Sequence, residues 1–161
     1  MQRNEIEKLL RDFQSKKVPL KQVADQIENL PYEDISFAKI DHHRSIRWGF
    51  PEVIFCQSKT PLQVAKIAEK IIKQKSNLLA TRANKEQFKA VKKLLPKAVF
   101  NEKAGIITYK INKINKLPGK VIIVTAGTSD IPIASESQKT GEMLGLDMEL
   151  INDAGVAGIH R

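Results

Sequence analysis

The amino-acid sequence predicts an α/β fold with a helical N-terminal arm, and three observations lead to this prediction. Apolar residues recur at helical spacing over the first thirty positions. Short apolar runs then alternate with amphipathic helical segments between residues 52 and 111. A continuous apolar run at 121–125 begins a further strand–helix–strand unit.

The arm, residues 1–35, is predicted to contain two short helices. The apolar spacing runs from Ile6 to Phe13 and again from Leu20 to Leu30. The second helix ends before a proline, which disfavours helical geometry in the preceding residue. We expect the arm to act in docking or oligomerisation. Residues that follow, 36–48, show no regular pattern and predict an irregular segment.

A basic α/β domain is predicted for residues 36–118. Two capping boxes mark helix starts, one from Thr60 with Gln63 and one from Asn84 with Gln87. The alternation of strands and helices favours a partly parallel sheet. The expected strands are 52–56, 77–81, 98–101 and 106–111.

A third region, 119–161, follows the Pro-Gly pair that ends the basic domain. Its first strand, Val121–Thr125, is β-branched at all five positions, which is typical of a strand buried on both faces. A helix at 131–144 is expected to end at Gly145, and a second strand follows at 148–151. So short a region cannot cover a central strand. Either other chains cover it or the sequence is a truncated piece of a longer protein, and we favour truncation.

The composition limits the environment in which the chain works. No apolar run approaches the ~20 residues of a membrane span, and the N-terminus lacks the apolar core of a signal peptide. The chain has a single cysteine, so a reducing compartment fits. We therefore expect a cytoplasmic protein with no membrane partner.

The net charge of +9 is unevenly distributed along the 161 residues. Residues 1–119 carry 24 Lys/Arg and 12 Asp/Glu, whereas residues 120–161 carry 3 and 6. A basic region attracts polyanions or phosphorylated small molecules, although a solvated Lys-rich surface explains it equally well. Aromatic residues are only 6% and form no stripe with basic residues, so we expect no nucleic-acid partner.

The strongest candidate site is the loop Gly127-Thr128-Ser129-Asp130, between a strand and a helix. Glycine permits a sharp turn and close approach of a ligand. Two hydroxyls and the free N–H groups of a helix start favour anions, and ligands bind at strand carboxyl ends in open α/β sheets. Ser129 or Asp130 is also expected to cap the helix, which is compatible with ligand contact. The loop matches neither a P-loop nor a GxGxxG fingerprint.

A second candidate cluster contains Asp41, Arg44 and Arg47. Two arginines three residues apart suit bidentate recognition of phosphate or carboxylate, but an internal salt-bridge knot explains the same residues. The adjacent His42 and His43 are a poor metal pair, and we predict no metal ligands in the sequence.

Two further residues carry possible chemistry near the end of the chain. His160 and Arg161 follow the second strand in a glycine-rich turn, where the histidine fits a general acid or base or a donor to a substrate carboxylate. A capping or core histidine fits equally well. Cys56 ends a predicted strand and is expected to serve in packing.

The two loops resemble those of the PurE-like phosphoribosylaminoimidazole (AIR) carboxylase family. VTAGTSDIPIA is similar to that family's GSxSD-type loop, and DAGVAGIHR to its SAHR-type loop. These two loop sequences, together with the preceding DHHRSIRWGFPEVIFCQSKT, are more similar to the LarB branch of the family, which makes the nickel-pincer nucleotide cofactor. The resemblance runs from about residue 20 to residue 161.

The resemblance implies that residues 119–161 begin a PurE-like three-layer α/β/α catalytic domain and that the complete protein is a homo-oligomer, an octamer. It implies carboxylation of nicotinic acid adenine dinucleotide at C5 of the pyridinium ring, with CO2 or bicarbonate. Hydrolysis of the phosphoanhydride then gives AMP and pyridinium-3,5-biscarboxylic acid mononucleotide. The implied metal is Mg2+, and no ATP is used.

The resemblance also implies residue roles. His160 would be catalytic, and the residues expected to bind substrate are Gly127, Thr128, Ser129, Asp130, Arg161, Asp41, Arg44 and Arg47. The family's cysteine nucleophile belongs to an Asn-Ser-Cys segment downstream of GIHR, and Cys56 does not match it. We therefore expect this chain alone to be inactive. An AIR carboxylase of purine biosynthesis and a non-catalytic nucleotide-binding module are the alternatives.

Overall fold

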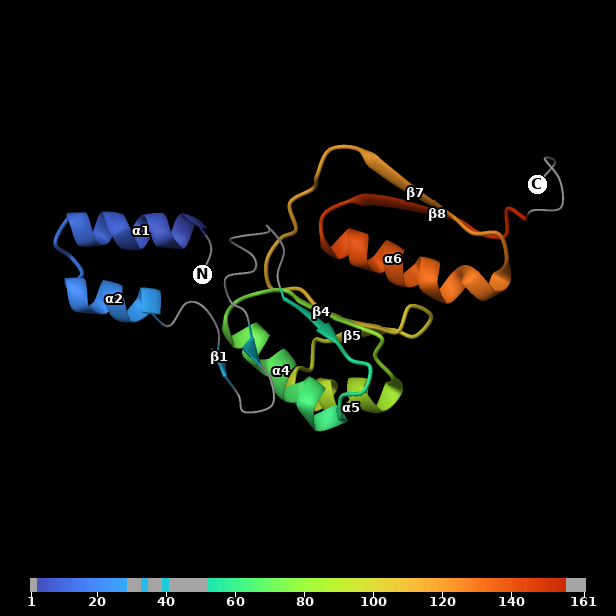
Figure 1. Ribbon diagram of the computed structural model, residues 1–161, viewed down its shortest axis with the longest axis horizontal. Coiled ribbons are helices and arrows are strands. Elements are labelled where there is room, and N and C mark those ends of the chain that lie inside the picture. Colours follow the sequence, from blue (N-terminus) through green and yellow to red (C-terminus); the bar gives the residue numbers. More distant parts are fainter. Residues whose placement is uncertain (1–2, 29–32, 35–38, 41–51, 156–161) are drawn as a thin grey trace. The chain divides into compact units, whose positions relative to one another are not determined.

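A computed structural model of the chain describes residues 3–28, 33–34, 39–40 and 52–155. The chain forms two compact units, residues 1–52 and 53–161. Helices combine with parallel and antiparallel strands (Figure 1), which confirms the predicted α/β class. The domain boundaries placed after residues 35 and 118 stay predictions.

The first unit contains the two predicted arm helices. They are α1 (Arg3–Gln14) and α2 (Leu20–Glu28), which pack against each other. Leu9 on α1 and Val23 on α2 are buried, as expected from their place on the apolar stripes.

A short hairpin follows these helices in the first unit. Strand β1 (Glu33–Asp34) pairs antiparallel with β2 (Lys39–Ile40). The expectation of an irregular segment over 36–48 is therefore wrong for its residues 39 and 40. Two residues are too few to show the alternation by which a strand is recognised in a sequence.

A four-stranded mixed sheet forms the centre of the second unit. Its strands are β3 (Val53–Phe55), β4 (Leu78–Thr81), β5 (Val99–Asn101) and β6 (Ile106–Tyr109). Their order is β3-β4-β6-β5. Strands β3 and β4 are parallel, whereas β6 is antiparallel to both of its neighbours. The prediction of a partly parallel sheet is confirmed.

Helices α4 (Pro61–Lys73) and α5 (Lys85–Leu94) begin at the two predicted capping boxes. The Gln63 N–H donates to the Thr60 hydroxyl, and the Thr60 N–H donates to the Gln63 side-chain oxygen at 2.9 Å. The same reciprocal pair joins Asn84 and its glutamine. The two helices pack together on one face of the sheet (Figure 1).

A strand–helix–strand segment completes the second unit. It comprises β7 (Lys120–Val124), α6 (Ile131–Met143) and β8 (Asp147–Ile151). Strands β7 and β8 are parallel. Gly145 ends the helix with φ +95°, a conformation that favours glycine, as the sequence predicted.

Helix α6 lies between this strand pair and the four-stranded sheet (Figure 1). Its Met143 forms a buried cluster with Leu79, Ala104 and Ile106. Successive strand residues point to opposite faces, so α6 covers the sheet face opposite α4 and α5. Helix α6 thereby connects the basic sheet to β7 and β8.

The described residues leave β7 partly uncovered, as expected for a region too short to cover a strand of this composition. Ile122 is 53% exposed and Val124 is 60% exposed. Helix α6 contacts the strand, and β8 pairs with one of its edges. The apolar run predicts that the strand needs to be buried, but it does not identify the segment that packs against the exposed residues.

Candidate functional site

Thr125 anchors the loop that follows β7. Its N–H donates to the Ile151 carbonyl at 2.9 Å, and its carbonyl accepts from the Ala154 N–H at 2.8 Å. Its hydroxyl oxygen also accepts from the Asp153 N–H at 3.2 Å. The side chain is buried. These bonds fix the carboxyl ends of β7 and β8 beside each other.

The predicted loop forms a compact 3-10 turn over Thr128–Asp130. The Gly127 N–H donates to Asp130 Oδ2 at 3.1 Å, and the Asp130 N–H donates to the Gly127 carbonyl at 3.2 Å. The expected side-chain cap of α6 is absent, because Asp130 precedes the helix without bonding to it and accepts instead from the start of the 3-10 turn. Its carboxylate is held inside the loop.

Gly127 does not use the conformational freedom of glycine. Its φ is −145°, which any residue adopts. A Cβ at this position would meet nothing within 4 Å. The predicted reason for the glycine, a sharp turn, is therefore wrong. The open space that surrounds it leaves room for a ligand at the loop.

Thr128 and Ser129 present exposed hydroxyls at the start of the turn. Neither hydroxyl has a hydrogen-bond partner within the part of the chain that the structure describes. A hydroxyl can donate one hydrogen bond and accept two, and it binds phosphate well beside backbone N–H groups at a helix start. The loop therefore offers donors that no described residue occupies.

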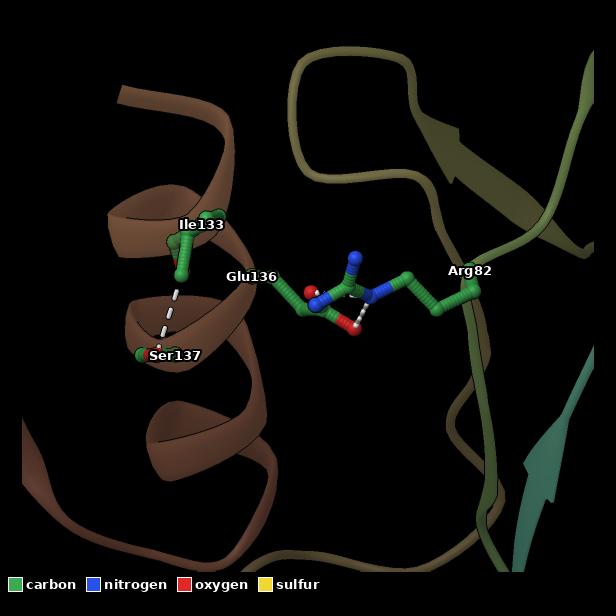
Figure 2. Close-up of polar contacts among 4 residues, drawn as sticks. All are labelled: Arg82, Ile133, Glu136 and Ser137. Carbon is green, nitrogen blue, oxygen red and sulfur yellow. Dashed lines mark hydrogen bonds and ion pairs between the residues drawn. The ribbon is translucent and has the colours of Figure 1, made fainter. Parts of the chain in front are cut away.

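A groove of about 450 Å³ adjoins the loop. Its walls come from the end of β7 and the first two turns of α6, namely Ile123, Val124, Thr125, Ala126, Asp130, Ile133, Ala134 and Ser137. Ser137 donates its hydroxyl proton to the Ile133 carbonyl at 3.1 Å (Figure 2). The walls are mainly apolar, so the groove fits the face of a flat ring.

The segment that leads to the second predicted motif lies beside this loop. The Gly155 N–H donates to the Ala126 carbonyl at 3.1 Å. The other predicted site residues, His160, Arg161, Asp41, Arg44 and Arg47, lie outside the described residues. Their roles stay predictions.

An ion pair that the sequence analysis missed connects the sheet to α6. Arg82 Nε lies 2.7 Å and 2.9 Å from the two carboxylate oxygens of Glu136 (Figure 2). The Glu136 side chain is only 16% exposed. The partners are 54 residues apart in sequence, and no local pattern signals such a pair.

Positive charge is concentrated in one part of the second unit. Residues 53–119 carry 15 Lys/Arg and 3 Asp/Glu, whereas residues 1–52 carry nine of each. The basic character assigned to the front of the chain therefore comes from residues 53–119, and residues 1–52 contribute no net charge.

Cys56 is a packing residue, as expected. Its side chain is 0% exposed, and its Sγ lies 3.8 Å from the Ile54 carbonyl oxygen. Burial raises the pKa of the thiol to about 11, against a smaller lowering by Lys59. A thiol of this kind is a poor nucleophile at neutral pH.

The described residues contain no cluster of three or more His, Cys, Asp or Glu side chains that could hold a metal. Asp130 has one carboxylate oxygen beyond the oxygen that accepts from Gly127. Mg2+ is commonly held by one or two carboxylates together with substrate phosphates, so Asp130 fits a magnesium ion shared with a ligand. No described helix is long and apolar enough to cross a membrane.

Comparison with known proteins identifies the family. Residues 32–112 match the LarB/PurE-like N-terminal domain. An uncharacterized protein of Methanocaldococcus jannaschii is 34% identical over 163 residues, which cover 95% of this chain and 62% of the relative. The chain thus spans less than two thirds of that relative's length. Because the domain model covers half of the sequence, the chain belongs to the LarB/PurE-like family, which is related to the PurE-type carboxylases.

Proposed function

We propose that the protein containing this chain carboxylates nicotinic acid adenine dinucleotide at C5 of the pyridinium ring and hydrolyses its phosphoanhydride, in nickel-pincer cofactor biosynthesis. The family assignment supports this proposal. The observation that carries it is the loop after β7, where Thr128 and Ser129 present hydroxyls that no described residue contacts, beside an apolar groove.

The loop and the groove suit the two chemical parts of a nicotinate nucleotide. The hydroxyls of Thr128 and Ser129 bind the phosphate, together with N–H groups of the turn. The groove takes the pyridinium ring against Val124 and Ile133 and limits the access of water to it. The basic region at 53–119 attracts the anionic substrate.

Asp130 would share a bound Mg2+ with the substrate, because one of its carboxylate oxygens lies beyond the oxygen that accepts from Gly127. When bound, the ion would neutralise negative charge on the phosphoanhydride. The Gly127 N–H keeps the Asp130 carboxylate in a fixed orientation. Cys56 has no part in the reaction, because its buried thiol keeps its proton at neutral pH.

Replacing Ser129 tests the proposal in a full-length protein. Ser129→Ala removes a phosphate donor and is expected to raise KM or lower kcat by about tenfold or more. The matched control is Ser15→Ala in the arm, whose hydroxyl already donates to the Asp12 carbonyl. Release of AMP and the mass of the carboxylated nucleotide measure turnover. Equal kinetics for Ser129→Ala and wild type, with the fold intact, would contradict the assignment of the loop.

A substrate exchange separates the alternatives. An AIR carboxylase would act on aminoimidazole ribonucleotide and leave the dinucleotide unchanged. A non-catalytic module would bind the dinucleotide without releasing AMP. The match to a LarB-type N-terminal domain favours the dinucleotide over the purine precursor.

A further inference from the structure

Arg82 occupies the carboxyl end of β4 in an uncommon backbone conformation. Its φ is +53°, in the left-handed region that glycine adopts most easily. A side chain in this region costs about 1 kcal/mol or more. Lys75 has a similar φ of +57° at the end of α4, so the strain alone does not distinguish Arg82. Lys75 therefore supplies a matched control for substitutions of Arg82.

The ion pair orients the Arg82 guanidinium. Glu136 accepts from Nε, and Figure 2 shows one terminal nitrogen of the guanidinium directed away from the carboxylate. The Arg82 side chain is 49% exposed. A guanidinium has five N–H donors in a rigid fork, so donors remain for a ligand. A guanidinium that is held by a carboxylate and still has exposed N–H donors suits bidentate contact with phosphate.

Helix α6 places its N-terminal loop at the same end of the unit as Arg82. Met143, near the end of α6, packs against Leu79 in β4, while Glu136, nearer the start, reaches Arg82 beyond the end of β4. The helix therefore runs antiparallel to β4. Six residues separate Asp130 from Glu136, which corresponds to about 9 Å along the helix.

The segment around the loop lacks a free cation of its own. Lys120 pairs with Glu149 at 2.6 Å, and Lys139 pairs with Glu142 at 2.7 Å. These are the only Lys or Arg residues between 120 and 155. Residues 120–155 therefore offer no unpaired basic side chain to a ligand with two phosphates, and Arg161, predicted to bind substrate, lies outside the described residues. Arg82 is the basic residue that an observed contact connects to α6.

We propose that Arg82 binds the phosphate of the AMP half of the dinucleotide while the 127–130 loop binds the nicotinate half. This inference rests on the proposed function. The two phosphates of the dinucleotide share one bridging oxygen, so the pyrophosphate lies between the loop and the guanidinium, and donors about 9 Å apart along the helix can each reach one phosphate. Glu136 is then a positioning residue for the Arg82 guanidinium.

The test compares Arg82→Gly with Lys75→Gly in the full-length protein. Both variants remove one positive charge from a position with positive φ, where glycine relieves strain. Titration calorimetry with the dinucleotide and with AMP measures the dissociation constants. Arg82→Gly is expected to weaken both ligands by about tenfold or more, whereas Lys75→Gly should change neither by more than about twofold.

A second variant separates a loss of ligand contact from a loss of folding. Arg82→Gly leaves Glu136 buried without a partner, which is destabilising. The double variant with Glu136→Gln removes that charge, and it should melt close to wild type while still binding AMP weakly. Unchanged affinity for AMP in the folded double variant would overturn the inference.

The loop variant distinguishes the two proposals. Ser129→Ala should weaken binding of the dinucleotide but leave AMP affinity unchanged. If Ser129→Ala weakens the dinucleotide and the Arg82 variants do not, the proposed function stands and the Arg82 contact is wrong. If the wild-type protein binds no dinucleotide, the proposed function and the contact are both wrong.

Discussion

Alkylation of Cys56 tests whether the single cysteine of this chain can act as a nucleophile. Related LarB proteins are expected to use a cysteine, and this chain has only one. The Cys56 side chain is fully buried, and desolvation raises the pKa of its thiol from the usual 9.0 to about 11. We expect native protein to react with iodoacetamide far more slowly than unfolded protein at pH 8.

The size of the effect follows from the pKa. At pH 8 about one in a thousand thiols with a pKa of about 11 is ionised, compared with about one in ten at a pKa of 9.0. Because the thiolate is the reactive form, ionisation alone slows alkylation by about a hundredfold. Burial slows it further, since the reagent reaches the sulfur only after local opening.

The assay follows the mass of the protein with time, and protein in guanidinium chloride serves as the control. Native Cys56 that reacts within about tenfold of the unfolded rate would refute the assignment to packing.

The raised pKa of Cys56 also predicts that the free energy of unfolding depends on pH. Its contribution of about 2–3 kcal/mol is complete below pH 9 and is lost as the pH rises through about 11. Chemical denaturation of Cys56→Ala should lack this loss.

Two further predictions concern stability. A Cβ at Gly145, where φ is +95°, would collide with the Asn115 carbonyl oxygen. Gly145→Ala should therefore lower the free energy of unfolding by about 2–4 kcal/mol. The control Gly119→Ala should lower it by only about 1 kcal/mol, because Gly119 has a similar φ of +94° but open space around it. Equal losses of the two variants in urea unfolding would contradict this prediction. The buried Gln87 side chain donates to two carbonyls of the loop after β3, so Gln87→Leu should cost about 2–4 kcal/mol. Gln63→Leu removes only an equivalent capping contact and should cost about 1 kcal/mol; similar melting temperatures for the two variants would show that the loop contacts are unimportant.

The sequence predicts the elements of the second unit well because their signals are local. A capping box places two polar residues three positions apart, and the Thr60 and Asn84 boxes both start helices as expected. Strand limits differ by one or two residues, as for β3, expected at 52–56 and observed at Val53–Phe55. Strand ends depend on hydrogen bonds to neighbouring strands, which a local pattern does not contain.

Contacts between distant segments could not be predicted in this way. Strand β6 inserts between β4 and β5, and the Arg82–Glu136 pair joins positions 54 residues apart. Gly127 illustrates a different failure. Its position in a loop suggested a need for glycine geometry, yet its φ of −145° is ordinary. The sequence thus predicts correctly that the loop lies between a strand and a helix, but it predicts neither the loop's internal hydrogen bonds nor its connection to the sheet, and the binding role of the loop stays a prediction.

The positions of charge and of loop chemistry assign different contributions to the two parts of the second unit. The 120–155 segment supplies hydroxyls and an apolar groove, but both of its lysines are ion-paired. The family's N-terminal domain, matched at 32–112, includes Arg82 and most of the basic residues. The pair from Arg82 to Glu136 joins these two segments directly. Among the described residues, the unpaired positive charge available to a polyanion at the loop therefore comes from the N-terminal domain, which gives a physical reason for joining a basic domain to this strand and loop.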